Sequence, residues 1–162
     1  MMIYEDIFRA FKKERIKYVI VGGIAVNLLG FVRSTADLDI LVEMTDANLK
    51  KIIKILKRKK YYARIPVDPL GLIDEKTRKD WVKNKHMKAL NFYKKNSLEG
   101  IDIVFNTPVS YMEARKTAKR IKIDDLIIPV ISIDNLIKMK KASSRNIDKI
   151  DIQELKKIKS FI

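Results

Sequence analysis

Cysteine is absent from this 162-residue chain, and histidine occurs only once, as His86. The absence of cysteine excludes disulfide bonds, thiolate metal sites and a cysteine nucleophile. A single histidine argues against a histidine-based metal centre and against a Ser-His-Asp triad. Any chemistry in this protein therefore rests on carboxylates, hydroxyls, lysines, arginines and the backbone.

Long apolar runs are also lacking. Residues 1–17 alternate charged and apolar side chains, so they contain no apolar signal segment. The longest uncharged run, residues 18–32, is shorter than the ~20 residues that span a bilayer, and it contains two glycines and Asn27. We therefore expect a cytoplasmic protein that does not enter membranes.

Acidic residues are few relative to basic ones. The chain has 35 Lys and Arg against 20 Asp and Glu, which gives a formal net charge of +15. This charge favours polyanionic partners, such as a triphosphate, RNA or an acidic protein surface. The alternative is that lysines such as those in 50–60 and 156–159 only solvate helix faces. A hydrophobic fraction of 47% is sufficient for a folded core, and we expect one domain over residues 1–162.

Two glycines follow an apolar strand. Residues 18–21 are a β-branched and aromatic run, typical of a buried strand, that ends at Gly22-Gly23. Residues 24–29 then predict a short helix that ends at Gly30. Glycine allows a sharp turn and leaves the main-chain N–H groups accessible, and the helix dipole directs its positive end toward the same turn. The turn is therefore a candidate anion site.

Two carboxylates begin the next strand. Residues 37–42 read Asp-Leu-Asp-Ile-Leu-Val, so a strand places Asp37, Asp39 and Leu41 on one face. Ionised carboxylates at the edge of a core repel each other and lose solvation, and a divalent cation would remove that cost. Mg²⁺ prefers oxygen ligands and shares them with substrate phosphates. We interpret Asp37 and Asp39 as metal ligands.

A third carboxylate, Asp102, interrupts another apolar strand. Residues 87–93 and 98–105 are strand-like runs joined by a short polar turn, which predicts a hairpin. If this hairpin brings Asp102 beside the strand at 37–42, the three carboxylates form one site for phosphoryl-transfer chemistry.

The order of these features resembles the DNA polymerase β-like nucleotidyltransferase superfamily. Gly-Gly, a helix, hydrophobic-Asp-hydrophobic-Asp-hydrophobic and a distant strand Asp follow one another in the chain. The string VGGIAVNLLGFVRSTADLDILV, residues 21–42, is most similar to the AbiEii-type branch and related small uncharacterised nucleotidyltransferases. Similarity continues through residues 131–140 to Arg145 and Asp148, whereas residues 57–98 match only loosely.

The resemblance implies an α/β (α+β) nucleotidyltransferase fold, a mixed β-sheet flanked by helices, with C-terminal helices (about 132–162) packing on the core. It implies transfer of a nucleoside monophosphate from an NTP to a hydroxyl, with Mg²⁺ or Mn²⁺. The site residues that it implies are Asp37, Asp39 and Asp102 for metal binding and catalysis, Gly22 and Gly23 facing the triphosphate, and Arg33, Thr35 and Lys140 supporting the nucleotide phosphates.

The acceptor stays open at this point. A tRNA or other RNA is the first expectation, a protein hydroxyl the second and a small molecule the third, in a toxin–antitoxin or defence setting. The rival interpretation is a non-catalytic module of the same fold that binds RNA or a partner protein through its basic surface.

Hydrophobic periodicity predicts most of the remaining elements. We expect helices over 3–17, 47–60 and 74–85, a helix from Thr107-Pro108 to about 116, and one that begins at Ser132 or Asp134. In that helix Lys140 continues an apolar stripe. Such a lysine either extends outward to solvent or points into the protein, and we expect the second because the resembled family has a lysine at this position. We also expect strands at 61–65, 118–123 and 126–131, a loop at 66–71, and a last helix, 147–162, whose inward residues are Ile147, Ile150, Leu155, Ile158 and Ile162.

Four aromatic residues are candidates for stacking on a nucleotide base, with core packing as the alternative for each. They are Tyr61, Tyr62, Trp81 and Tyr93.

Overall fold

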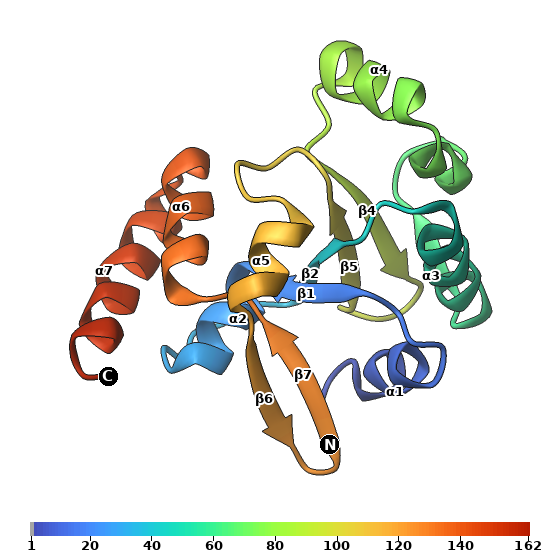
Figure 1. The fold of residues 1–162 in the computed structure, drawn as a ribbon. Helices are drawn as coiled ribbons and strands as arrows, with labels where there is room; N and C mark the ends of the chain where they lie inside the picture. Colours follow the sequence, from blue (N-terminus) through green and yellow to red (C-terminus); the bar gives the residue numbers. More distant parts are fainter. Residues whose placement is uncertain (1) are drawn as a thin grey trace.

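A seven-stranded mixed sheet forms the centre of the molecule (Figure 1). The structure is a computed structural model that describes residues 2–162. The strand order is β3-β4-β5-β2-β1-β7-β6. The strands are β1 (Tyr18–Val21), β2 (Asp37–Val42), β3 (Tyr61–Ala63), β4 (Ala89–Lys94), β5 (Gly100–Val104), β6 (Lys119–Ile123) and β7 (Leu126–Val130).

Seven α-helices and one 3₁₀ helix lie around this sheet in the described chain. None of the helices in residues 2–162 has both the length and the apolarity needed to cross a membrane. The helices are α1 (Glu5–Lys13), α2 (Gly22–Leu29), α3 (Asp46–Arg58), the 3₁₀ helix η1 (Pro69–Ile73), α4 (Glu75–Lys85), α5 (Tyr111–Thr117), α6 (Ile133–Ser143) and α7 (Asn146–Ser160).

One face of the sheet is apolar and covered. Leu38 and Ile40 of β2 are fully buried, as are the residues of β5 that pair with them. Phe11 of α1 packs edge-on against Tyr18 of β1, with ring centroids 4.9 Å apart. Helices α1 and α3 lie on this side of the sheet, and α5, α6 and α7 lie on the other (Figure 1).

The opposite face carries the carboxylates. Strands β2 and β5 pair in parallel, with Asp39 opposite Asp102 and Asp37 opposite Gly100. Strand β4 joins β5 as an antiparallel hairpin. Because directly paired residues point to the same face, the three carboxylates lie on one surface. The predicted hairpin and the placement of its Asp102 beside the first carboxylate strand are confirmed.

Several helices begin one or more residues away from the expected positions, and α2 and α5 show the local reason. Helix α2 begins at Gly22 rather than Ile24, because Gly22 itself makes the turn with a φ of 69°. Helix α5 begins after Ser110 rather than at Thr107-Pro108. Ser110 accepts a hydrogen bond from the Glu113 N–H and donates its own N–H to the Glu113 carboxylate, a capping box that fixes the start.

The inward face of α7 also differs from the expectation. Ile147 and Ile150 are 37% and 48% exposed, whereas Asp148 and Asp151 are almost completely buried. Of the other expected inward residues, Leu155 is buried and Ile158 packs against the core, whereas Ile162 is 82% exposed. The buried face of α7 therefore begins with two carboxylates, Asp148 and Asp151. Their burial requires cations nearby.

Candidate active site

The carboxylates of β2 and β5 form a cluster with excess negative charge. Burial, then the charge of Asp102 and a hydrogen bond between the two carboxyl groups, hold the pKa of Asp39 well above its usual range, while Lys140 opposes the shift. Burial and the charge of Asp102 also raise the pKa of Asp37, and Arg64 opposes this shift. Carboxylates so close together favour the binding of a proton or a cation.

Gly22 leaves space for the Asp39 carboxylate. A Cβ at Gly22 would overlap this carboxylate, and the φ of +69° lies in the left-handed region. Gly100, opposite Asp37 in the sheet, leaves space in the same way, because a Cβ there would overlap the Asp37 carboxylate. Both carboxylates therefore depend on a neighbouring glycine for their positions.

We expect Gly22→Ala to destabilise the protein by about 1–2 kcal/mol through its left-handed backbone alone, and further by displacing Asp39. Urea denaturation of the variant and the wild type measures the loss. A loss no larger than the backbone cost of about 1–2 kcal/mol would contradict the steric role assigned to Gly22.

The loop before β2 lies against the second glycine. A Cβ at Gly23 would approach the side chains of Thr35 and Arg33. Asn27 of α2 fixes this loop, because its side-chain amide donates to the Arg33 carbonyl and accepts from the Arg33 N–H, both at 3.0 Å. The structure thus brings Gly23, Arg33 and Thr35 together. They do not line the pocket beside Asp39, and their role in supporting phosphates stays a prediction from the family resemblance.

Arg33 and Lys140 contact buried carboxylates of α7. Arg33 donates two hydrogen bonds to Asp151, at 2.7 and 2.8 Å. Lys140 points into the protein as expected, and its Nζ lies 2.8 Å from Asp151 and 3.3 Å from Asp148. Arg145 completes the group through a 3.0 Å hydrogen bond to Asp148. We call these five residues the α7 ion network.

The pKa values of Asp148 and Asp151 are low although both carboxylates are buried. Burial raises the pKa of Asp148, but hydrogen bonds from Arg145 and Ser143 and the charge of Lys140 outweigh it and lower the pKa to about 2. Burial likewise raises the pKa of Asp151, and hydrogen bonds from Arg33 and Lys140 outweigh it. Both groups are therefore ionised at neutral pH and hold the cations in place.

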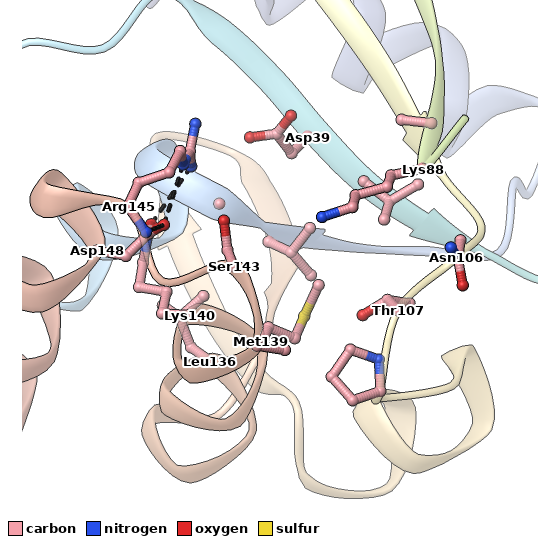
Figure 2. A pocket seen from close by; sticks show the side chains of 16 residues that line it. Asp39, Lys88, Asn106, Thr107, Leu136, Met139, Lys140, Ser143, Arg145 and Asp148 are labelled. Carbon is pink, nitrogen blue, oxygen red and sulfur yellow. Dashed lines mark hydrogen bonds and ion pairs between the residues drawn. The ribbon is translucent and has the colours of Figure 1, made fainter. Parts of the chain in front are cut away.

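A pocket of about 540 Å³ opens beside Asp39 (Figure 2). Its lining includes Gly22 at the start of α2 and apolar residues of β4 and β5. Figure 2 shows Lys88 and Arg145 on opposite sides of the pocket, with Met139 of α6 along its wall. Cationic groups, a helix N-terminus and apolar walls suit a ligand with an anionic part and a ring.

Sequence reasoning assigns no role to four residues of this region: Lys88, Arg145, Asp148 and Asp151. Asp148 and Asp151 fall on the helical line of Leu155, three and four residues apart, and an acidic pair in line with a core residue could have indicated buried partners. Lys88 carries no such signal, because it lies in a lysine-rich segment where the family resemblance is weak.

The donor atoms of the carboxylate cluster fit a divalent cation. No group of three or more His, Asp or Glu side chains in residues 2–162 is already arranged around one ion position. Mg²⁺ usually takes only one or two protein carboxylates and completes its shell with water and substrate phosphates. Asp39 and Asp102, opposite each other in the sheet, provide such a pair.

The four candidate stacking residues divide into two groups. Trp81 is buried and packs near Phe105, with ring centroids 6.3 Å apart, and Tyr61 is also buried. These two belong to the core. Tyr62 is 44% exposed and Tyr93 is half-buried, and both lie on the carboxylate face of the sheet.

Comparison with known proteins identifies the fold. No family model and no curated protein matches the chain. Among solved structures, the lincosamide antibiotic adenylyltransferase LnuA with lincomycin bound matches with a TM-score of 0.63 and 18% identity, covering 94% of both chains. The Thermotoga maritima protein TM1012, a proposed nucleotidyltransferase, matches with a TM-score of 0.56 and 12% identity, covering 98% of this chain and 89% of its own. The chain therefore has a nucleotidyltransferase fold, and the AbiEii-type assignment stays a prediction.

Proposed function

We propose that this protein transfers a nucleoside monophosphate from an NTP to a hydroxyl group and releases pyrophosphate. The observation that carries the proposal is the register of β2 and β5, which sets Asp39 opposite Asp102. This pair lies beside the glycine turn and beside the pocket flanked by Lys88 and Arg145. The nucleotidyltransferase fold of the structural neighbours supports the same reaction.

In this proposal the pocket holds the NTP. The N-terminus of α2 and the side chains of Lys88 and Arg145 bind the phosphates. Met139 and the apolar pocket residues of β4 and β5 contact the ribose or base. Lys140 reduces the negative potential at Asp39 from its place in the α7 ion network. Positioning and fixed charge then supply most of the rate acceleration.

Asp39 and Asp102 would hold Mg²⁺ or Mn²⁺, with Asp37 on the same face as the third predicted ligand. The ion would supply charge neutralisation and a lowered pKa of the attacking hydroxyl. Asp102 accepts the proton of that hydroxyl. The hydroxyl oxygen forms a bond to the α-phosphorus, and the bond from this phosphorus to the oxygen that bridges it to the β-phosphate breaks. Pyrophosphate leaves with that oxygen, so that atoms and charges balance.

RNA is the acceptor that we propose, because the chain carries a net charge of +15. A small molecule is the second candidate, because the neighbour LnuA binds lincomycin. A toxin–antitoxin or defence setting stays a prediction from the family resemblance.

The test incubates purified protein and Mg²⁺ with each of four α-labelled NTPs and with total RNA, cell protein or a small-molecule extract. Label in RNA supports both the reaction and the proposed acceptor. Label in cell protein or in the small-molecule extract supports the reaction but shows that the acceptor is a protein or a small molecule rather than RNA. An absence of transfer to all three fractions, with RNA binding that needs neither Mg²⁺ nor NTP, would favour the non-catalytic module.

Mg²⁺ should also raise the melting temperature, and more at about pH 8 than at about pH 5. The folded pKa values of Asp37 and Asp39 are raised, so protonation stabilises the fold and this stability is lost as pH rises through those values. At the higher pH the ionised cluster gains most from a cation, whereas at the lower pH protons compete. Each kcal/mol gained corresponds to a shift of about 2–4 °C.

Differential scanning fluorimetry with and without Mg²⁺ at both pH values measures this shift. Asp102→Asn should reduce it, whereas Asp46→Asn, on exposed α3 surface, should not. An equal shift in both variants would place the ion elsewhere.

A further inference from the structure

A row of aromatic residues extends from the carboxylates across the sheet. In the strand register, Asp37 of β2 pairs with Gly100 of β5, Gly100 with Tyr93 of β4, and Tyr93 with Tyr62 of β3. Directly paired residues share a face, so both tyrosines point to the side of the sheet that carries Asp37. With strands 4.7–4.9 Å apart, the two tyrosines lie roughly 10 and 14 Å from Asp37.

A parallel row carries polar groups. Asp39 pairs with Asp102, and Asp102 pairs with Asn91 of β4. The Arg64 N–H donates to the Asn91 carbonyl at 2.9 Å, so the residue that follows β3 continues this row. Arg64 therefore lies one strand beyond Asn91 in the row that contains Asp102.

Cations lie over both rings. The Arg64 guanidinium carbon is 5.6 Å from the Tyr93 ring centre, and the Lys95 ammonium is 5.2 Å from the Tyr62 ring centre. The two ring centres are 6.1 Å apart, with planes inclined by 46°. Arg64 and Lys95 are both exposed, so their charges are available to a ligand on this surface.

This surface differs from the covered face of the same strands. Tyr61, next to Tyr62 in β3, points the other way, is buried and donates its hydroxyl to Glu99 at 2.7 Å. Tyr62 remains 44% exposed. The exposed tyrosine therefore lies on the side of β3 that faces the candidate active site, and the buried one packs in the core.

We propose that this surface, which comprises Tyr62, Arg64, Tyr93 and Lys95, binds the single-stranded 3′ end of a nucleic acid acceptor. Base-on-aromatic stacking, together with cations that contact the phosphates, is the usual basis of single-strand binding. A duplex does not present its base faces to such a surface, so the acceptor end is single-stranded. The role of the surface in catalysis rests on the proposed function, because the strand would direct its terminal hydroxyl toward Asp37 and Asp102.

The test measures the affinity of the protein for a labelled single-stranded RNA oligonucleotide by fluorescence anisotropy, with no NTP present. The double variant Tyr62→Ala/Tyr93→Ala should weaken binding at least about tenfold, whereas Tyr62→Phe/Tyr93→Phe, which keeps both rings, should bind within about twofold of the wild type. Melting curves of both double variants show whether they are folded.

A second pair of variants tests the charges. Arg64→Ala/Lys95→Ala should weaken binding. It should also make the slope of log affinity against log salt concentration shallower, by the amount that corresponds to about two phosphate contacts. Lys54→Ala/Lys57→Ala is the matched control, because it removes two exposed charges from α3 on the other side of the sheet. A DNA oligonucleotide of the same sequence distinguishes a requirement for ribose from binding to either nucleic acid.

Binding and transfer can fail separately. The proposed binding role of the surface is overturned if the wild type and the tyrosine-to-alanine variant bind RNA with equal affinity, or if the wild type has no measurable RNA affinity. This holds even if label is transferred to another acceptor. If that variant binds RNA more weakly but the wild type transfers no nucleotide, the result supports RNA binding by this surface and contradicts the proposed enzymatic function.

Discussion

Asp39→Asn is expected to reduce nucleotidyl transfer by about 10²–10³-fold or more, while the protein stays folded. The substitution keeps the shape of the side chain beside Gly22 and removes its charge. Burial and neighbouring carboxylates raise the pKa of Asp39, so its ionised form is unfavourable in the folded protein. Removing the charge should leave the free energy of unfolding at neutral pH unchanged or increase it.

Initial rates with an α-labelled NTP and urea denaturation of the same preparation measure the two effects. Asp46→Asn, a substitution of the same kind on exposed α3 surface, should retain activity. Full activity in Asp39→Asn would falsify the assignment of this residue. Loss of activity together with loss of folding would contradict the claim that the carboxylate serves catalysis at a cost in stability.

Asp151→Ala is expected to have the largest effect on stability, about 3–5 kcal/mol. Its carboxylate is completely buried and contacts Arg33 and Lys140. Removing it leaves the buried Lys140 with Asp148 as its remaining partner and releases Arg33 from α7. The loop that holds Thr35 against Gly23 should then become more mobile, so NTP binding should weaken as well.

Chemical denaturation of Asp151→Ala and of Glu154→Ala provides the comparison. Glu154 forms a 3.0 Å ion pair with Lys157 near the surface of α7, and such a pair contributes about 0.2–1 kcal/mol. The pKa of Asp151 is lowered by folding, so its contribution is present at neutral pH and is lost as pH falls through the lowered value. The difference between the variants should therefore shrink in acid. Similar losses at neutral pH would show that the network is not the main support of α7.

The face that carries the carboxylates could be predicted because strand periodicity determines it. In residues 37–42 and 100–104, apolar residues alternate with Asp, and the alternation alone places the carboxylates opposite the core. The short polar turn before Gly100 predicts the hairpin that brings Asp102 to β2. In these segments the alternation within each strand and the pairing between the strands place the carboxylates on the same face, so the sequence pattern is sufficient to predict it.

The inward face of α7 could not be predicted in this way. A hydrophobic stripe counts Ile147 and Ile150 as buried and any Asp as solvated, and the structure shows the reverse for Asp148 and Asp151. These carboxylates are buried because cations that are distant in sequence neutralise them. Periodicity within one helix contains no information about such partners. The start of α5 differs from the expected one for another reason, which is local: a capping box between Ser110 and Glu113 outweighs the preference of Pro108 for a first helical turn.

The α7 ion network has a consequence for the timing of synthesis. Arg33 and Asp151 are 118 positions apart in the chain, and at ribosomal speeds of about 5–20 residues per second roughly 6–24 s separate their synthesis. During that interval the guanidinium of Arg33 lacks its carboxylate partner, and the loop beside the glycine turn has only its hydrogen bonds to Asn27. A nascent chain that has already built β1, β2 and β5 would thus hold its three carboxylates before the surrounding site is complete. If the proposed function holds, competence to bind an NTP would arise only once α7 has emerged from the ribosome and docked.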